Sequence, residues 1–165
     1  MTFHSRLGSI TTFIFDMDGV LTDGSLFATE TGELVRRFNI KDGYALKLAK
    51  EKGFHVALIS GGKSPSAKQR FLDLGIPDVY MGVADKAEVF KDYLFENDIE
   101  AGQVLYMGDD LPDYDVMKMV GLPACPSDAS GEIKAISLYI SPFCGGEGCV
   151  RDVIEKVLKV QDKWV

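Results

Sequence analysis

Long hydrophobic runs, cysteine pairs and an excess of positive charge are all missing from this sequence of 165 residues. No apolar stretch approaches the ~20 residues that a membrane-spanning helix needs, and the first residues lack the apolar core of a secretory signal. The three cysteines, Cys125, Cys144 and Cys149, are too few for a disulfide framework and lack further ligands for a zinc site. A net charge of −7 argues against general nucleic-acid binding. We therefore expect a cytoplasmic protein without a nucleic-acid or membrane partner.

Strand patterns and helix patterns alternate along the chain, which predicts an α/β fold. Apolar runs typical of buried strands lie at 12–15, 55–59, 78–81, 103–107, 122–124 and 138–140. Helical patterns lie at 43–52 (with Asp42 as the expected N-cap), 65–74, 85–97 and 150–160. This order predicts right-handed βαβ units and a three-layer, doubly wound parallel sheet. Segment 25–38 breaks the alternation and indicates a β-hairpin. We expect one domain, 1–165, with this hairpin as an insert.

The most informative motif is Asp-Met-Asp-Gly-Val-Leu-Thr-Asp-Gly at 16–24, directly after the strand predicted at 12–15. Asp16 and Asp18 are two residues apart at the end of a strand, so both are expected to reach one region. Two like charges ~4 Å apart repel by ~4 kcal/mol at an effective dielectric near 20. A bound Mg²⁺, which prefers oxygen ligands, would remove that penalty. The alternative is a strand-ending turn, which Asp and Gly also favour.

Three further strand ends carry residues suited to binding phosphate or metal. Ser60 and Gly61 follow the strand at 55–59, and Lys86 follows the strand at 78–81. The strand at 103–107 ends in Gly-Asp-Asp-Leu-Pro-Asp at 108–113. Taken singly, the glycines could form a flexible turn and the lysine could be solvated. Because ligands bind at the carboxyl ends of parallel strands, two acid clusters at such ends are a more specific signal.

These four segments, in this order, resemble the motifs of haloacid-dehalogenase (HAD) superfamily phosphatases. Segments 39–43, 61–63 and 145–151, together with Arg70, resemble additional motifs of a cap-less branch that acts on 8-carbon and 9-carbon keto-sugar acid phosphates. The greatest likeness is to the 3-deoxy-D-manno-octulosonate (KDO) 8-phosphate phosphatases of the lipopolysaccharide precursor pathway. The resemblance implies an Mg²⁺-dependent phosphatase that releases KDO and phosphate. A 9-carbon acid 9-phosphate, of KDN or N-acetylneuraminate, is the alternative substrate.

The resemblance also implies a role for each motif residue. Asp16 would attack phosphorus and form an aspartyl-phosphate, and Asp18 would act as general acid and then general base. Ser60 and Lys86 would hold the phosphoryl oxygens. Asp113 would orient Lys86 or a metal-bound water. The magnesium ligands implied are Asp16, the backbone carbonyl of Asp18, Asp109 and Asp110.

Recognition of the sugar acid is expected to need a cation for its carboxylate. The candidates are Lys63, Arg70 and Lys41, with Gly61 beside the phosphate. Lys63 stands where the nearest branch often has arginine, and Glu147 stands where relatives often have a basic residue. Both departures bear on the identity of the sugar, not on the chemistry.

The spacing of the motifs leaves no room for the cap domain that many relatives insert, so the hairpin at 25–38 is the only available lid. We expect a homotetramer in which hairpins pack together and a neighbouring subunit covers the site. Two other classes remain open. A receiver-like signalling domain would also form an aspartyl-phosphate but would not need Asp18. A catalytically idle regulatory subunit would have no reason to retain all the motif residues.

Overall fold

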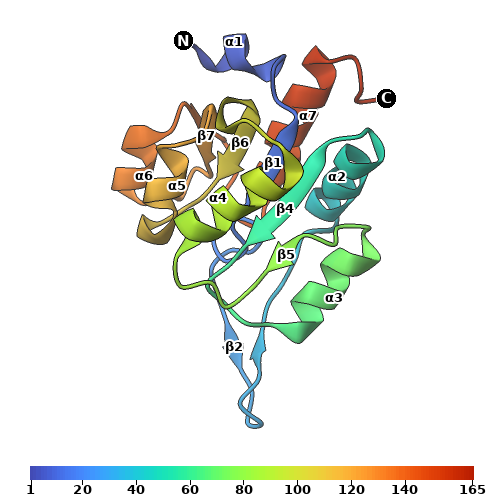
Figure 1. Cartoon of the computed structure of the whole chain (residues 1–165). Helices are drawn as coiled ribbons and strands as arrows, with labels where there is room; N and C mark the ends of the chain where they lie inside the picture. The colour runs from blue at the N-terminus through green and yellow to red at the C-terminus, as the bar shows by residue number, and fades with distance from the viewer.

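The sheet predicted from the sequence is present in the computed structural model, which describes residues 1–165. Six parallel strands are arranged in the order β5-β4-β1-β6-β7-β8, as expected for a doubly wound α/β fold (Figure 1). Their bounds are β1 Thr12–Phe15, β4 His55–Ile59, β5 Val79–Tyr80, β6 Val104–Met107, β7 Leu122–Cys125 and β8 Tyr139–Ile140. Because the order reverses direction at β1, the carboxyl ends of β1, β4 and β6 meet at the topological switch point, where ligands bind in such folds.

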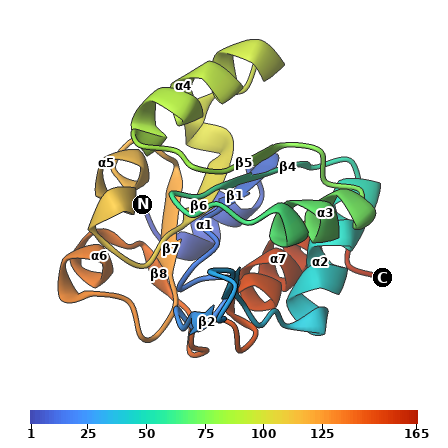
Figure 2. The same cartoon turned by 90° about the horizontal axis from the view of Figure 1, so that it is seen from below.

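Helices cover both faces of the sheet and form its outer layers (Figure 2). One face packs against α1 Phe3–Leu7, α2 Ile40–Glu51, α3 Pro65–Asp73 and α7 Cys149–Val160. The other packs against α4 Lys86–Asn97, α5 Tyr114–Met117 and α6 Gly131–Ile136. Two 3₁₀ turns, η1 Ala101–Gln103 and η2 Leu111–Asp113, flank β6. The short helices α1, α5 and α6 were not among the predicted elements.

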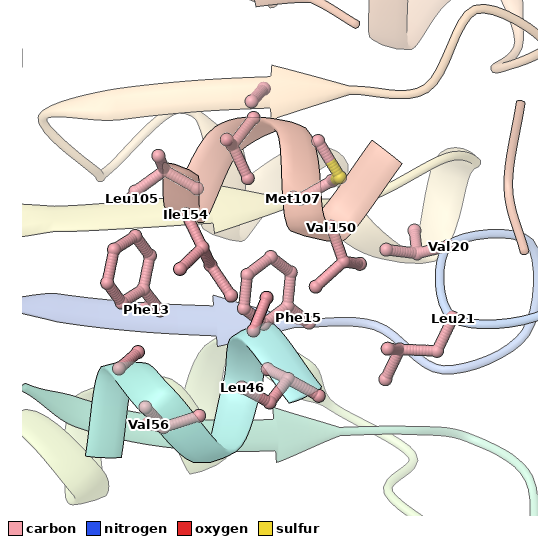
Figure 3. Packing of buried hydrophobic residues seen from close by; sticks show 14 of the residues in the cluster. Phe13, Phe15, Val20, Leu21, Leu46, Val56, Leu105, Met107, Val150 and Ile154 are labelled. Atoms are coloured by element: carbon pink, nitrogen blue, oxygen red, sulfur yellow. The ribbon is translucent and has the colours of Figure 1, made fainter. Parts of the chain in front are cut away.

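Alternation along β1 explains why the strand is apolar at nearly every position. Phe13 and Phe15 point into the core beneath α2 and α7, where Leu46 and Ile154 also lie (Figure 3). Ile14 points to the opposite side and joins the core beneath α4, α5 and α6. A parallel strand that is buried on both faces needs such a continuous apolar run. The first strand is thereby fixed at the centre of the sheet, and Asp16 follows it directly.

Local capping residues set most helix starts, but one differs from the prediction. Ser64 caps α3, which has Pro65 at its first position, and Asp85 caps α4. Helix α2 begins at Ile40, not at residue 43, because Asn39 accepts hydrogen bonds from the first free N–H groups. The expected cap, Asp42, is buried and accepts instead from the backbone N–H of Arg151 in α7 at 2.9 Å.

The hairpin predicted at 25–38 is present and extends away from the sheet as a narrow projection (Figure 1). It pairs β2 Phe27–Ala28 with β3 Leu34–Val35, and the chain has no cap domain. Phe27 is 65% exposed, and Leu34 and Val35 are exposed as well. No helix has the length and apolarity needed to cross a membrane.

Candidate active site

A cavity of about 440 Å³ lies at the carboxyl ends of the central strands, and it collects residues from all four predicted motifs. Those among the candidates that line it are Asp16, Asp18, Ser60, Gly61, Lys86, Asp109, Asp110 and Asp113. They follow four different strands, β1, β4, β5 and β6, so only the fold brings them together. The cavity is polar and strongly acidic, which is unusual unless a cation or a donor compensates the charge.

Asp16 lies at the floor of this cavity, buried and with its two oxygens in different surroundings. Its Oδ1 accepts a hydrogen bond from the backbone N–H of Met17 at 2.7 Å and lies 2.8 Å from Nζ of Lys86. Both of these contacts are made by Oδ1, and neither involves Oδ2. Burial raises the pKa of Asp16 to about 6, and the charge of Asp113 adds to this while Lys86 opposes it. One oxygen is thus held in place while the other is free to react or to bind an ion.

Asp113 serves as an anchor for Lys86. Its Oδ1 accepts from Nζ of Lys86 at 2.8 Å and from the Tyr106 hydroxyl at 2.7 Å. Its Oδ2 accepts from the backbone N–H groups of residues 109–110 at 3.1 and 3.4 Å. Burial alone would lower the pKa of Lys86, but Asp16 and Asp113 outweigh it and raise it. Lys86 is therefore a fixed positive charge that faces the cavity.

The acid cluster fits a divalent cation. Carboxylate oxygens of Asp16, Asp109 and Asp113 lie within 4.8 Å of one another. Burial raises the pKa of Asp109 to about 8, with the neighbouring Asp16 as the next cause. Such a carboxyl group resists ionisation in the bare protein, and a hard cation would reverse that preference. Since both oxygens of Asp113 already accept hydrogen bonds, Asp16 and Asp109 are the carboxylates with capacity left for an ion.

Asp110 is exposed at the rim of the cavity and also has a local structural role. Its Oδ1 accepts from the backbone N–H of Leu111 at 2.8 Å, which caps the turn η2. A direct bond from this side chain to an ion would compete with that cap. A contact through a water molecule would leave that cap in place.

Asp18 has a partner that the sequence analysis did not identify. Nε of Arg36 lies 2.8 Å from Asp18 Oδ1, and Nη2 lies 3.1 Å from Oδ2, so the pair is bidentate. Thr22 Oγ1 adds a longer donor contact of 3.4 Å to Oδ1. Arg36 directly follows β3, and its side chain is only 3% exposed. The sequence offered one indirect signal, a basic residue at the base of the only hairpin.

Glycines let the loop at 16–24 approach Asp109 closely and let the loop at 145–148 approach the loop at 16–24. Gly19 has φ +87°, and a Cβ atom there would overlap the Asp109 carboxylate. A Cβ atom on Gly145 would overlap the backbone carbonyl of Gly19. Gly146 donates its N–H to the carbonyl of Val20 at 2.9 Å. The loop at 145–148 therefore packs against the loop at 16–24 and holds it in place. This contact does not depend on any further role of residues 145–148 toward a ligand.

The candidates for sugar recognition lie outside the lining of this cavity, with the exception of Gly61. Lys63 is next to the lining residue Gly62, and its side chain packs against Gly82. Arg70 places its guanidinium 5.7 Å from the ring centre of Phe38, and its buried Nε has no hydrogen-bond partner. Lys41 lines a different cavity. Their roles toward a substrate stay predictions.

That second cavity, of about 940 Å³, is larger and lies between the start of α2 and helix α7. Its charged side chains have mixed signs: Lys41, Lys159 and Glu155 all line it, and Lys159 pairs with Glu155 at 2.6 Å. No group of three potential metal ligands gathers there, since the one such cluster in the protein is Asp16, Asp109 and Asp113. We therefore assign the chemistry to the smaller cavity at the strand ends.

Comparison with known proteins identifies the family, although no family model matches the chain. The sequence is 37% identical over 159 residues to 3-deoxy-D-manno-octulosonate 8-phosphate phosphatase KdsC of Escherichia coli K12, covering 96% of this chain and 85% of that protein. The chain belongs to the KDO 8-phosphate phosphatase family. The KDO 8-phosphate phosphatase structure from Yersinia pestis superposes with a TM-score of 0.95 at 34% identity, covering 98% of this chain and 87% of that one.

A second KDO 8-phosphate phosphatase structure was solved with ligands. The enzyme from Moraxella catarrhalis was solved with a magnesium ion, a phosphate ion and a KDO molecule. It superposes with a TM-score of 0.94 at 31% identity and covers 98% of this chain and 92% of that chain. A relative from Legionella pneumophila, described as a HAD superfamily subfamily III A hydrolase, superposes with a TM-score of 0.94 at 30% identity, covering 98% of this chain and 88% of that one. The family of these relatives is the one that the sequence motifs of this chain resemble.

Proposed function

We propose that this protein is an Mg²⁺-dependent phosphatase that hydrolyses KDO 8-phosphate to KDO and phosphate, as a cytoplasmic step toward lipopolysaccharide. One observation carries the proposal: in a chain of this family, Asp16 and Asp109 converge on one point beside the fixed cation Lys86. A phosphate monoester brings negative charge into that cavity. Only a metal ion together with Lys86 would make it attractive there.

Asp16 is the proposed nucleophile because Met17 and Lys86 hold its Oδ1 and neither of them contacts its Oδ2. Oδ2 would form a bond to phosphorus as the bond from phosphorus to the sugar oxygen breaks, which leaves an aspartyl-phosphate. Asp18 would give its proton to the departing sugar oxygen and later take a proton from the water that attacks the aspartyl-phosphate. The water restores the Asp16 carboxylate and releases inorganic phosphate.

Lys86 and Ser60 are the proposed holders of the phosphoryl oxygens. Lys86 is fixed by two carboxylates, so it loses little freedom when phosphate arrives. Ser60 is 1% exposed, and its Oγ accepts from the backbone N–H of Gly62 at 3.1 Å, which leaves its own hydroxyl proton free to donate. Mg²⁺, held by Asp16, Asp109 and the Asp18 carbonyl with Asp110 nearby, would supply charge neutralisation at the phosphoryl group.

Phosphate release from KDO 8-phosphate tests the proposal, with N-acetylneuraminate 9-phosphate, KDN 9-phosphate and a nucleotide as comparison substrates. We expect the 8-carbon acid to give the highest kcat/KM, with Mg²⁺ required and excess EDTA abolishing turnover. Asp16→Asn should retain the fold by circular dichroism and lose turnover. Near-normal activity of Asp16→Asn, or equal activity on all substrates, would contradict the assignment. A phosphoenzyme that survives for minutes in the native protein, as sampled by acid quenching at successive times, would instead favour a receiver-like role.

The assembly we propose is a homotetramer in which the hairpins pack together. Phe27, Leu34 and Val35 expose apolar side chains on both strands of the hairpin, and burying them against a second copy would remove that surface from water. Size-exclusion chromatography with light scattering should give a mass four times that of the monomer. Phe27→Asp should lower that mass, whereas Phe95→Asp, on the far helix α4 and 89% exposed, should not. A wild-type monomer with full activity would contradict the assembly.

A further inference from the structure

Asp16 and Asp18 each pair with a different cationic side chain, and the mechanism so far gives a role to only one of these two cations. Lys86 pairs with Asp16, while Arg36 pairs with Asp18. The second pair is the more directional, because both Nε and Nη2 of Arg36 bind, one to each carboxylate oxygen. Such a bidentate contact fixes the plane of the carboxylate as well as its position.

The burial of this pair is asymmetric. The Arg36 side chain is 3% exposed, whereas Asp18 is 31% exposed and lines the cavity. Arg36 therefore lies behind the carboxylate and leaves one edge of it open to a ligand. A Cβ atom on Gly62 would come within 2.8 Å of Arg36 Nη2 and 3.0 Å of Asp18 Oδ2, so the absence of a side chain there makes room for the pair.

On this geometry, and given the proposed function, we infer that Arg36 is a positioning residue that aims the Asp18 carboxyl group at the leaving-group oxygen. Without the bidentate contact from Arg36, Asp18 can rotate about its side-chain bonds, with only the 3.4 Å contact from Thr22 to restrain it. Proton transfer in the transition state requires donor and acceptor within hydrogen-bond distance. Since Arg36 follows β3, the position of the hairpin also sets the position of the general acid.

Dependence on the leaving group separates this role from a merely structural one. A sugar hydroxyl leaves poorly unless it receives a proton, whereas p-nitrophenolate leaves well without one. We expect Arg36→Met to slow phosphoenzyme formation from KDO 8-phosphate by roughly 10-fold to 100-fold, within the ~10²–10⁴-fold that general acid catalysis contributes. The same variant should slow phosphoenzyme formation from p-nitrophenyl phosphate by less than about 3-fold, because that substrate does not use the acid.

A double-mutant cycle tests whether Arg36 acts through Asp18. With KDO 8-phosphate, the variant with both Asp18→Asn and Arg36→Met should be no slower than Asp18→Asn alone, since coupled residues are not additive. Arg36→Lys keeps the positive charge but loses the bidentate contact. Its rate of phosphoenzyme formation should fall between those of wild type and Arg36→Met. The matched control is Arg37→Met, the neighbouring arginine that is 67% exposed and pairs with Glu147. It should stay within about twofold of wild type, as is usual for an exposed ion pair.

Equal slowing of both substrates, or additive effects in the cycle, would overturn the inference. If Arg36→Met does not fold, the Arg36→Lys comparison of the two substrates decides in the same way. Wild-type protein that releases no phosphate from KDO 8-phosphate would instead overturn the proposed substrate. If wild type and the Arg36 variants hydrolyse KDO 8-phosphate at the same rate, only the role of Arg36 is overturned.

Discussion

Asp109 is expected to destabilise the metal-free protein, and replacing it should reveal how much. The pKa of Asp109 is raised from 3.8 to about 8, and that of Asp16 from 3.8 to about 6. In both cases burial is the leading cause. Between about pH 4 and pH 8 the folded protein therefore binds more protons at these groups than the unfolded chain does. Stability that is present below pH 4 is lost as the pH rises through the folded pKa values.

The magnitude follows from the shift at Asp109. A rise of the pKa from 3.8 to about 8 corresponds to about 6 kcal/mol, at ~1.4 kcal/mol per pH unit. Because Asp109 is partly exposed, solvent screening reduces this to about 1–3 kcal/mol. For a domain of this size, ~2–4 °C per kcal/mol gives a melting temperature about 2–12 °C higher for Asp109→Asn at pH 8 in EDTA.

Magnesium should remove most or all of the stability advantage of Asp109→Asn over wild type. At a hundred times its dissociation constant, a ligand adds ~2.7 kcal/mol to the native state. Wild type should gain that stability at pH 8, while Asp109→Asn, which lacks a proposed ligand, should gain little. Asp92→Asn, an exposed position on α4, is the matched control and should behave as wild type. Differential scanning fluorimetry at pH 5 and pH 8, in EDTA and in Mg²⁺, gives the melting temperature of each protein. An Asp109→Asn protein that is less stable than wild type in EDTA, or equally stabilised by Mg²⁺, would refute the reasoning.

Three further outcomes are expected. Gly19→Ala should abolish Mg²⁺-dependent activity and lower the melting temperature, because its Cβ atom would overlap Asp109 at a backbone φ of +87°; an active Gly19→Ala protein would contradict this. Lys86→Met should destabilise the metal-free protein by about 3–5 kcal/mol near pH 7, as Asp16 and Asp113 lose their buried cation. Urea unfolding measures this loss, which should shrink toward pH 4, and an equal loss at both pH values would argue against it. Dialysis against EDTA should remove turnover, and Mg²⁺ added back should restore it without refolding.

The elements that the sequence predicted well are those with local signals. The strands at 12–15 and 55–59 are continuous apolar runs, and their bounds agree with β1 and β4. Helix α3 has both a capping serine and a proline at its first position. In contrast, α1 and α5 span 5 and 4 residues, too few for a helical period to be visible. Their presence depends on packing, not on pattern.

Competition between two good capping residues explains the error at α2. Asn39 and Asp42 are both favourable N-caps, and the sequence does not say which of them is needed elsewhere. In the folded protein Asp42 accepts from the backbone of Arg151, more than a hundred residues along the chain. Burial raises the pKa of Asp42 to about 6 even so. A partner on another helix decides the helix start, and a local pattern cannot reveal it.

The same division applies to the site. Residues at strand ends were predictable because a parallel sheet brings its carboxyl ends together whatever the details of packing. The position of Arg36 was not predictable, because it depends on how the hairpin folds back over the loop at 16–24. The guanidinium of Arg70 lies over Phe38, between α2 and α3, and its contact with a substrate stays a prediction. Long side chains reach several ångströms, so sequence position constrains their end groups poorly.

The distribution of positive charge around the two motif aspartates suggests how this site keeps them chemically distinct. Asp16 shares its cation with Asp113, so Lys86 is only partly available to it, and burial still raises the pKa of Asp16. Asp18 has Arg36 to itself and lies closer to solvent. A nucleophile must present one free oxygen toward phosphorus, whereas an acid–base must keep a fixed direction and exchange protons with the solvent. Each carboxylate has the surroundings that its proposed task requires, although the two are separated by a single residue.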